Sequence, residues 1–202
     1  MRLLIYGGSF NPPHKGHVAA AMAAADAIRP DKFFIIPDYI PPHKTLDAAS
    51  PSPAQRLEMT RLAFADVPGA EVTELEISRA GKSYTADTVE YFSEKYPGSE
   101  ILLVIGSDML LTFTEWYRFE YLLGRCTLIV LSRFGSDMAQ LDAYAEHLKK
   151  GFGAKVRIVE HDPVLTSSSI LRSVIAAGGH DAAIPEKVYE YIKINGLYKN
   201  DF

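Results

Sequence analysis

Short, nearly continuous apolar runs that alternate with longer helical patterns constrain the fold of this chain most. The runs predict strands at Arg2–Tyr6, Lys32–Ile36, Glu100–Ile105, Thr127–Ser132 and Lys155–Val159. Strands of this kind are typical of parallel sheets that helices cover on both faces. Because parallel neighbours need crossover connections, the alternation predicts an α/β fold with a doubly wound, mainly parallel sheet.

Apolar residues recur at helical spacing between these runs and after the last of them. The pattern predicts helices over His17–Ile28, Pro53–Asp66, Thr85–Tyr96, Asp137–Lys150, Ser167–Gly178 and Pro185–Gly196. No strand separates the last two, so we expect a C-terminal helical subregion over about residues 163–202. A chain of 202 residues suits one domain, and we expect residues 1–202 to form it.

Composition and charge exclude several classes of protein. The net charge is -4 and the pI about 5.9, so there is no overall basic field to hold nucleic acid. No apolar run approaches the roughly 18 residues of a membrane span, and no signal-peptide pattern opens the chain. Cys126 is the only cysteine and precedes an apolar strand, so we interpret it as a small buried hydrophobe. We therefore expect a cytoplasmic protein without nucleic-acid or membrane partners.

The loop "GGSFNPPHKGH", which follows the first predicted strand, is the strongest functional motif. Its prolines exclude a strand or a helix interior, and doubly wound sheets bind ligands where such loops leave the strands. Gly7 and Gly8 let a ligand approach the backbone, and Gly16 does so at a helix start that attracts phosphate. His14 and His17 can add N–H donors there. The alternative is a tight structural turn with incidental histidines.

Three further residues each have a functional and a structural interpretation. Asp108 follows a predicted strand, where it can accept hydrogen bonds from ribose hydroxyls or cap the next helix. Lys44 lies in the proline-rich loop Pro37–Pro53 and can close over a phosphate or remain a solvated surface cation. Trp116 is the only tryptophan, and a lone tryptophan is more often a core anchor than a ligand contact.

The segment "TSSSILRS" predicts a second phosphate-binding helix start. Ser167 and Ser168 supply hydroxyls and backbone amides, and Arg172 follows one turn later with a guanidinium that fits phosphate oxygens. An ordinary serine N-cap with a surface arginine is the alternative.

The opening loop resembles the first signature of the HxGH nucleotidyltransferases and, more narrowly, the form found in nicotinate-nucleotide adenylyltransferases. The segments "PPHK", "SYTADT", "GSDMLLTFTEW" and "TSSSILR" match that family in order and spread over nearly the whole chain. Some positions depart from the family pattern. Ser9 and Asn11 stand where many relatives have Thr and Asp, and Thr166 and Ser169 stand where relatives have Ile and Thr. Phe134 replaces the proline of an R-P-G turn, which weakens the match at the neighbouring arginine.

This resemblance implies an enzyme that transfers the adenylyl group of ATP to nicotinate mononucleotide in NAD synthesis. It implies catalytic roles for His14, His17 and Arg172 around the triphosphate. The ATP site that it implies consists of Gly7, Gly8, Ser9, Phe10, His14, Gly16, His17, Gly106, Asp108, Ser167, Ser168 and Arg172. The mononucleotide site consists of Asn11, Lys44, Tyr84, Thr85, Asp108, Trp116 and Arg133. Mg²⁺ is expected on the phosphates of ATP, without a dedicated protein metal site.

Two other functions remain open at this point. Another nucleotidyltransferase, acting on phosphopantetheine or glycerol phosphate, could share the first motif, although it has no reason to carry "SYTADT" with Trp116. A non-catalytic nucleotide sensor could use the same fold, although the intact H-x-G-H and Arg172 favour catalysis. The oligomeric state does not follow from the sequence.

Overall fold

The structure, a computed structural model, describes residues 1–42, 50–133, 138–162, 164 and 166–199 of the chain. Within these residues six parallel strands form one sheet in the order β3-β2-β1-β4-β5-β6. The strands are β1 (Arg2–Gly8), β2 (Lys32–Pro37), β3 (Ala70–Val72), β4 (Glu100–Gly106), β5 (Cys126–Arg133) and β6 (Lys155–His161). The five predicted strands and the parallel sheet are confirmed, and β3 is an additional edge strand.

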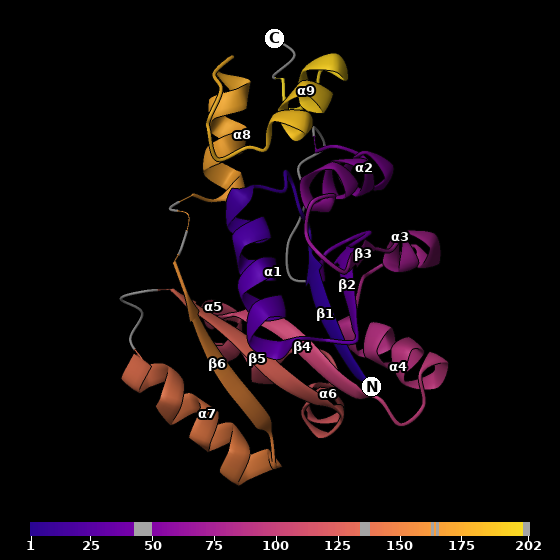
Figure 1. Cartoon of the computed structure of the whole chain (residues 1–202), viewed down its shortest axis with the longest axis vertical. Coiled ribbons are helices and arrows are strands. Elements are labelled where there is room, and N and C mark those ends of the chain that lie inside the picture. Colours follow the sequence, from indigo (N-terminus) through magenta and orange to yellow (C-terminus); the bar gives the residue numbers. More distant parts are fainter. Residues whose placement is uncertain (43–49, 134–137, 163, 165, 200–202) are drawn as a thin grey trace.

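Helices cover both faces of this sheet (Figure 1). The longer ones are α1 (Lys15–Ile28), α2 (Pro53–Phe64), α4 (Thr85–Lys95), α7 (Met138–Phe152), α8 (Ser168–Ala176) and α9 (Glu186–Ile194). The shorter ones are α3 (Leu75–Arg79), α5 (Ser107–Leu111), the 3-10 helix η1 (Phe113–Glu115) and α6 (Phe119–Arg125). All six predicted helices are present, with ends that differ by one or two residues. The apolar pattern did not predict the four short ones.

Alternate side chains of the strands build two separate hydrophobic clusters. In β1, Leu4 packs into the cluster under α1 and α2, whereas Leu3 and Ile5 pack into the cluster under α4, α6 and α7. Both faces of β1 are therefore buried, which is why its sequence is a continuous apolar run. Cys126 is 3% exposed and burial raises the pKa of its thiol to about 12, so it is the small buried hydrophobe that we expected.

Strand β1 lies at the point where the strand order reverses, because it pairs with β2 on one side and β4 on the other. A sheet of this order has a crevice between the loops that follow the two central strands. The opening loop leaves β1 there, and Gly106 ends β4 beside it. The topology thus brings two sequence motifs to one edge of the sheet.

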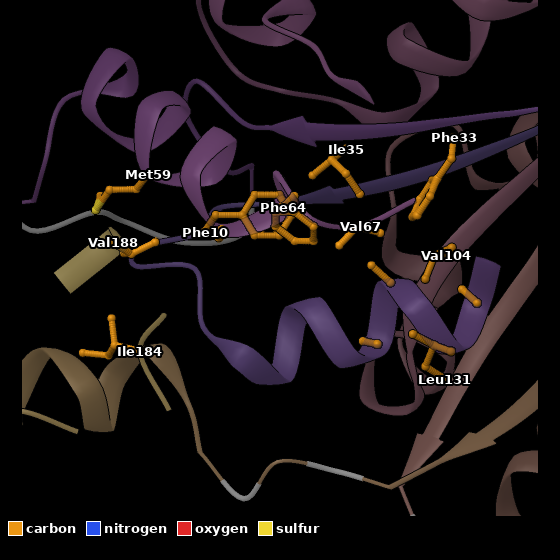
Figure 2. Packing of buried hydrophobic residues seen from close by; sticks show 14 of the residues in the cluster. Phe10, Phe33, Ile35, Met59, Phe64, Val67, Val104, Leu131, Ile184 and Val188 are labelled. Carbon is orange, nitrogen blue, oxygen red and sulfur yellow. The ribbon is translucent and has the colours of Figure 1, made fainter. Parts of the chain in front are cut away.

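The C-terminal helices pack on the same cluster as α1 and α2. Ile184 and Val188 lie in one cluster with Phe10, Met59 and other buried residues (Figure 2). In Figure 1, α8 and α9 lie beyond the ends of the strands at which the opening loop emerges. No helix in the described part of the chain is long and apolar enough to cross a membrane.

Candidate active site

A cavity of about 770 Å³ opens at this edge of the sheet. Its walls come from the opening loop, the start of α5, the end of β6 and the start of α8. Every residue of the predicted ATP site lines it, as does Asn11 from the predicted mononucleotide site. The fold therefore brings Ser9 and Arg172, which lie far apart in the sequence, to one site.

Three described residues of the predicted mononucleotide site lie outside this cavity. As far as the described residues define this cavity, Tyr84, Thr85 and Trp116 do not line it. Trp116 stacks on the buried Phe113 with 4.9 Å between ring centroids, which agrees with a packing role for one of its faces. The ring of Tyr84 contacts that of Tyr117 at 4.5 Å.

The positions of two predicted basic side chains are outside what the structure describes. Lys44 is outside the described residues, and Arg133 ends β5 with a side chain that is not described.

Several lining residues were not predicted from the sequence. They include Tyr6, Ser50, Ser107, His161, Thr166 and Ser169. His161 is the last residue of β6, and its Nδ1 lies 3.2 Å from the carbonyl oxygen of Ser132. A polar residue at the end of a strand could have indicated it, but the predicted strand stopped two residues earlier.

The two histidines of the opening loop are stacked, with ring centroids 3.8 Å apart. The backbone N–H of His14 donates to Nδ1 of His17 at 3.2 Å. A neutral imidazole that accepts at one nitrogen carries its proton on the other, so Nε2 is the N–H donor of the His17 ring. His17 also lies in the first turn of α1, where the helix dipole favours negative charge. The site thus combines a positioned donor with a positive field.

Gly16 and Gly106 each leave space for a side chain of the same motif. A Cβ on Gly16 would lie 2.9 Å from Nδ1 and Cε1 of His14. A Cβ on Gly106 would lie 2.6 Å from Oδ1 of Asp108. We expected Gly16 to leave room for a ligand. In the structure, the His14 ring occupies the space that a Cβ at this position would need.

Asp108 presents an exposed carboxylate to the cavity. The N-cap of α5 is Gly106, and Asp108 is the second residue of the helix, so the predicted alternative of a capping aspartate is wrong. Burial, and to a smaller extent the Asp108 charge, raises the pKa of the Tyr6 hydroxyl above its usual range. Asp108 is therefore available to accept hydrogen bonds from a ligand.

The opening loop is strained and is held from α2. Phe10 has φ +44, a left-handed conformation that costs a bulky residue about 1–2 kcal/mol. Just before it, the Ser9 hydroxyl donates to Oδ2 of Asp38 at 2.6 Å. The fully buried Arg56 donates from Nη1 to the Ser9 carbonyl at 2.9 Å and to Oδ1 of Asp38 at 2.8 Å. Strain of this kind persists only where surrounding contacts determine the conformation, as they do here.

The start of α8 holds the same loop from the other side. Arg172 donates from Nη1 to the Asn11 carbonyl at 2.8 Å, and the Ser168 hydroxyl donates to the Pro12 carbonyl at 2.9 Å. Ser167 is the N-cap of α8 and accepts from the Ile170 N–H at 3.3 Å, as the structural interpretation proposed. Arg172 is more than a surface arginine, because it contacts the loop and lines the cavity.

A buried carboxyl lies beneath the segment "SYTADT". Glu76 is 6% exposed and accepts a hydrogen bond from the Thr88 hydroxyl at 2.5 Å. Burial raises its pKa to about 7, against the lowering effects of Thr88, Ser83 and Arg79. Ser83 in turn accepts from the Tyr39 N–H at 2.8 Å. Glu76 therefore belongs to a polar network that joins α3, α4 and the loop after β2.

Comparison with known proteins assigns the family. The pattern of the cytidylyltransferase-like family matches residues 5–174. A probable nicotinate-nucleotide adenylyltransferase of Gloeobacter violaceus is 39% identical, over 98% of this chain and 96% of the relative. One of Carboxydothermus hydrogenoformans is 37% identical, over 96% of each chain. The fold matches the solved Plasmodium falciparum nicotinic acid mononucleotide adenylyltransferase complexed with NaAD, with a TM-score of 0.78, 20% identity and coverage of 98% and 97%. This chain belongs to the cytidylyltransferase-like family and, within it, to the nicotinate-nucleotide adenylyltransferases.

Proposed function

We propose that this chain transfers the adenylyl group of ATP to nicotinate mononucleotide, forming nicotinate adenine dinucleotide and pyrophosphate. The 5′-phosphate oxygen of the mononucleotide bonds to the α-phosphorus of ATP, and the bond from that phosphorus to the pyrophosphate oxygen breaks. The observation that carries the proposal is that the residues of the HxGH, Gly106–Asp108 and Ser167–Arg172 motifs line one cavity in a chain of this family. The protein needs no nucleophile of its own, because positioning and charge stabilisation suffice for phosphoryl chemistry.

The triphosphate fits the end of the cavity where α1 and α8 begin. The Nε2–H of His17 and the positive end of α1 favour the negative charge that develops on the departing pyrophosphate. Arg172 adds a positive charge at the start of α8, and its guanidinium has N–H donors beyond those used on Asn11 and Ser169. Asp108 can orient a ribose through its hydroxyls.

Magnesium fits this site as a companion of the nucleotide. No group of three or more metal-ligating side chains is found in the part of the chain that the structure describes. Asp108 lines the cavity with a carboxylate oxygen, a donor that Mg²⁺ prefers together with phosphate and water. When bound, Mg²⁺ would neutralise the charge on the phosphate oxygens.

The start of α4 is our candidate for recognition of the pyridine carboxylate. Tyr84 is the N-cap of α4, and no side-chain hydrogen bond caps this helix in the described residues. First-turn N–H groups have no acceptor within a helix and carry the positive end of its dipole, so they favour a carboxylate over a carboxamide. Lys82 is a competing charge partner, but it is exposed and forms an isolated β-bridge with Ile40 before the helix begins. Tyr84 and Thr85 lie at this helix start, and the Tyr84 ring contacts Tyr117, the residue after Trp116. We therefore expect nicotinate to be preferred over nicotinamide.

A substrate panel tests the function. Purified protein with ATP and Mg²⁺ is given nicotinate mononucleotide, nicotinamide mononucleotide, phosphopantetheine or glycerol phosphate, and pyrophosphate release is measured. We expect the highest kcat/KM with nicotinate mononucleotide and a tenfold to several hundredfold preference over the nicotinamide form, as expected for roughly 1–3 kcal/mol per unpaired donor. Equal use of the two pyridine substrates would contradict the nicotinate assignment.

The variant Lys82→Ala tests the origin of the preference. If backbone N–H groups recognise the carboxylate, the variant keeps the preference. If the preference disappears while nicotinate mononucleotide is still used, Lys82 is the charge partner and the function stands. Failure to release pyrophosphate with any of the four acceptors would favour a nucleotide sensor over an enzyme.

A further inference from the structure

The last described turn of the chain directs a tyrosine at the opening loop. After α9, the N–H of Leu197 donates to the Ile192 carbonyl at 3.0 Å, and the chain turns back through Gly196 at φ +62. Tyr198 follows, also at φ +62, and is 7% exposed. A left-handed conformation is uncommon for a bulky aromatic residue and persists only where the surroundings determine it.

Tyr198 reaches a residue 187 positions earlier in the chain. Its hydroxyl donates to Oδ1 of Asn11 at 2.7 Å in a buried contact. Burial raises the pKa of this hydroxyl well above its usual range, against the opposing charges of Arg172 and Arg56, so the group remains an O–H donor. With Oδ1 held by Tyr198, the Nδ2 group of Asn11 is directed to the Ser50 hydroxyl at 3.3 Å.

Asn11 is a residue of the opening loop that two C-terminal side chains contact. Arg172 holds its carbonyl oxygen, and Tyr198 holds its side chain. Asn11 follows the strained Phe10 and lines the cavity, whereas Tyr198 is not among the lining residues in the described part of the chain. Any effect of the Tyr198 hydroxyl on a ligand must therefore pass through Asn11.

We propose that Tyr198 is a positioning residue for the transfer reaction, which fixes the Asn11 amide in one orientation toward the mononucleotide side of the cavity. The inference rests on the proposed function, because Asn11 is assigned to mononucleotide binding there. It makes the C-terminal turn part of the site's architecture, although no motif of the sequence marks Tyr198. An amide without the Tyr198 donor can rotate, so its Nδ2 group would no longer be held where the substrate needs it.

The variant Tyr198→Phe removes the hydroxyl and keeps the ring. We expect kcat/KM for nicotinate mononucleotide to fall about tenfold and the KM for ATP to change by less than about twofold. Tyr189→Phe is the matched control, because it removes a tyrosine hydroxyl from α9 outside the residues that line the cavity, and we expect it to behave like the native protein. A native kcat/KM in Tyr198→Phe would overturn the inference, as would a loss confined to the KM for ATP.

A double-mutant cycle separates positioning from general destabilisation. In an Asn11→Ala background, Tyr198→Phe should cause no further loss of kcat/KM, because the group through which it acts is gone. An equal loss in both backgrounds would show a structural effect and overturn the inference. The side-chain amide signal of Asn11 in the ¹⁵N-labelled protein should also shift in Tyr198→Phe and not in Tyr189→Phe.

The native protein in the same assays keeps the two proposals apart. If it fails to transfer to nicotinate mononucleotide, the proposed function is wrong, whatever the amide signal reports. If it transfers normally and Tyr198→Phe does too, only the role of Tyr198 is wrong.

Discussion

At the scale of single residues, this site depends on contacts that fix ring and guanidinium orientations. His17 is oriented because Nδ1 accepts the N–H of His14, and Gly16 is required because the His14 ring occupies the space of a Cβ. Arg56 is oriented by acceptors on three residues, since its Nη2 also donates to the Tyr39 carbonyl at 2.7 Å. Such contacts hold a donor at a defined place before the substrate arrives, which is what electrostatic preorganisation requires.

His17→Ala removes the positioned donor, and we expect kcat to fall by roughly 10²–10³-fold. The fold should persist, since His17 is a partly exposed residue of the first turn of α1. Steady-state kinetics with ATP and nicotinate mononucleotide, together with a far-UV circular dichroism spectrum, check both statements. A kcat/KM close to that of the native enzyme would remove this histidine from the mechanism.

Arg56→Met leaves Asp38 buried without its cation. Removal of one partner of a buried ion pair costs about 3–5 kcal/mol, and we expect the free energy of unfolding to fall by about that amount. The double variant Arg56→Met with Asp38→Asn should recover part of the loss, because the uncompensated charge is gone. Urea unfolding of the native protein and the two variants measures these free energies, and a loss below about 1 kcal/mol in Arg56→Met would contradict the importance of this pair.

At the scale of elements, two short helices carry the carboxyl groups of Glu76 and Asp108. Helix α3 spans five residues, yet it carries Glu76 beneath the start of α4. Helix α5 is equally short and carries Asp108. Segments of less than two turns contain too few residues to display a helical period, so the apolar pattern did not predict them. The long helices are different, because α1 is rich in alanine, the best helix former, and buries Ala20, Ala21 and Ala24 on the sheet.

Glu76 gives the junction of α3 and α4 a pH dependence. The pKa of Glu76 rises from an ordinary value of 4.5 to about 7 in the folded chain. Between these two pH values the folded state retains a proton that the unfolded state releases. The resulting contribution to stability is complete below about pH 4.5 and is lost as the pH rises through about 7. Glu76→Gln cannot ionise, and we expect its Tm to depend less on pH in this range.

The measurement is the Tm of both proteins from about pH 5 to about pH 8. The difference between variant and native protein should move in favour of Glu76→Gln as the pH rises. The charges of Arg79 and Asp38 also affect the pKa of Glu76. Both residues remain in Glu76→Gln, so the difference in Tm between the two proteins reports the titration of Glu76 itself. Parallel curves for the two proteins would show that the pKa of Glu76 is not raised in the folded chain.

At the scale of the whole molecule, the C-terminal helices complete the core on one face of the sheet. Ile184 and Val188 pack in the same cluster as Leu4 of β1 and Phe64 of α2. The N–H of Lys15, the first residue of α1, donates to the Ala183 carbonyl at 2.8 Å. The C-terminal subregion therefore stabilises the element that begins the functional site.

Ile184→Ala tests this coupling. Ile184 is 2% exposed, and such a truncation costs about 2–5 kcal/mol. We expect the Tm to fall by roughly 2–4 °C per kcal/mol, in one transition for the whole chain. Fluorescence of Trp116, which packs on the opposite face of the sheet, follows the unfolding of that face. Circular dichroism follows the unfolding of the helices. Two separate transitions would show that the C-terminal subregion unfolds independently.

The local sequence was sufficient to predict every described strand except the short edge strand β3, together with the long helices and the motif loops. Continuous apolar runs reveal doubly covered parallel strands, and glycines, prolines and histidines reveal a loop shaped for a ligand. The resemblance to a family predicted the residues of an ATP site, and the structure brings all of them to one cavity. These features are local in the chain or carried by motifs, so a linear pattern contains them.

Only the tertiary structure decided which residues hold the motifs in place. Arg56 and Asp38 belong to no motif, yet both bind Ser9. Tyr198 lies at the end of the chain and meets Asn11 near its beginning. Contacts of this kind join residues that the sheet order and the packing of α2, α8 and α9 bring together, and no local periodicity encodes them. The local sequence therefore determines the helices, the strands and the chemical groups of the site, whereas the orientation of those groups depends on long-range packing.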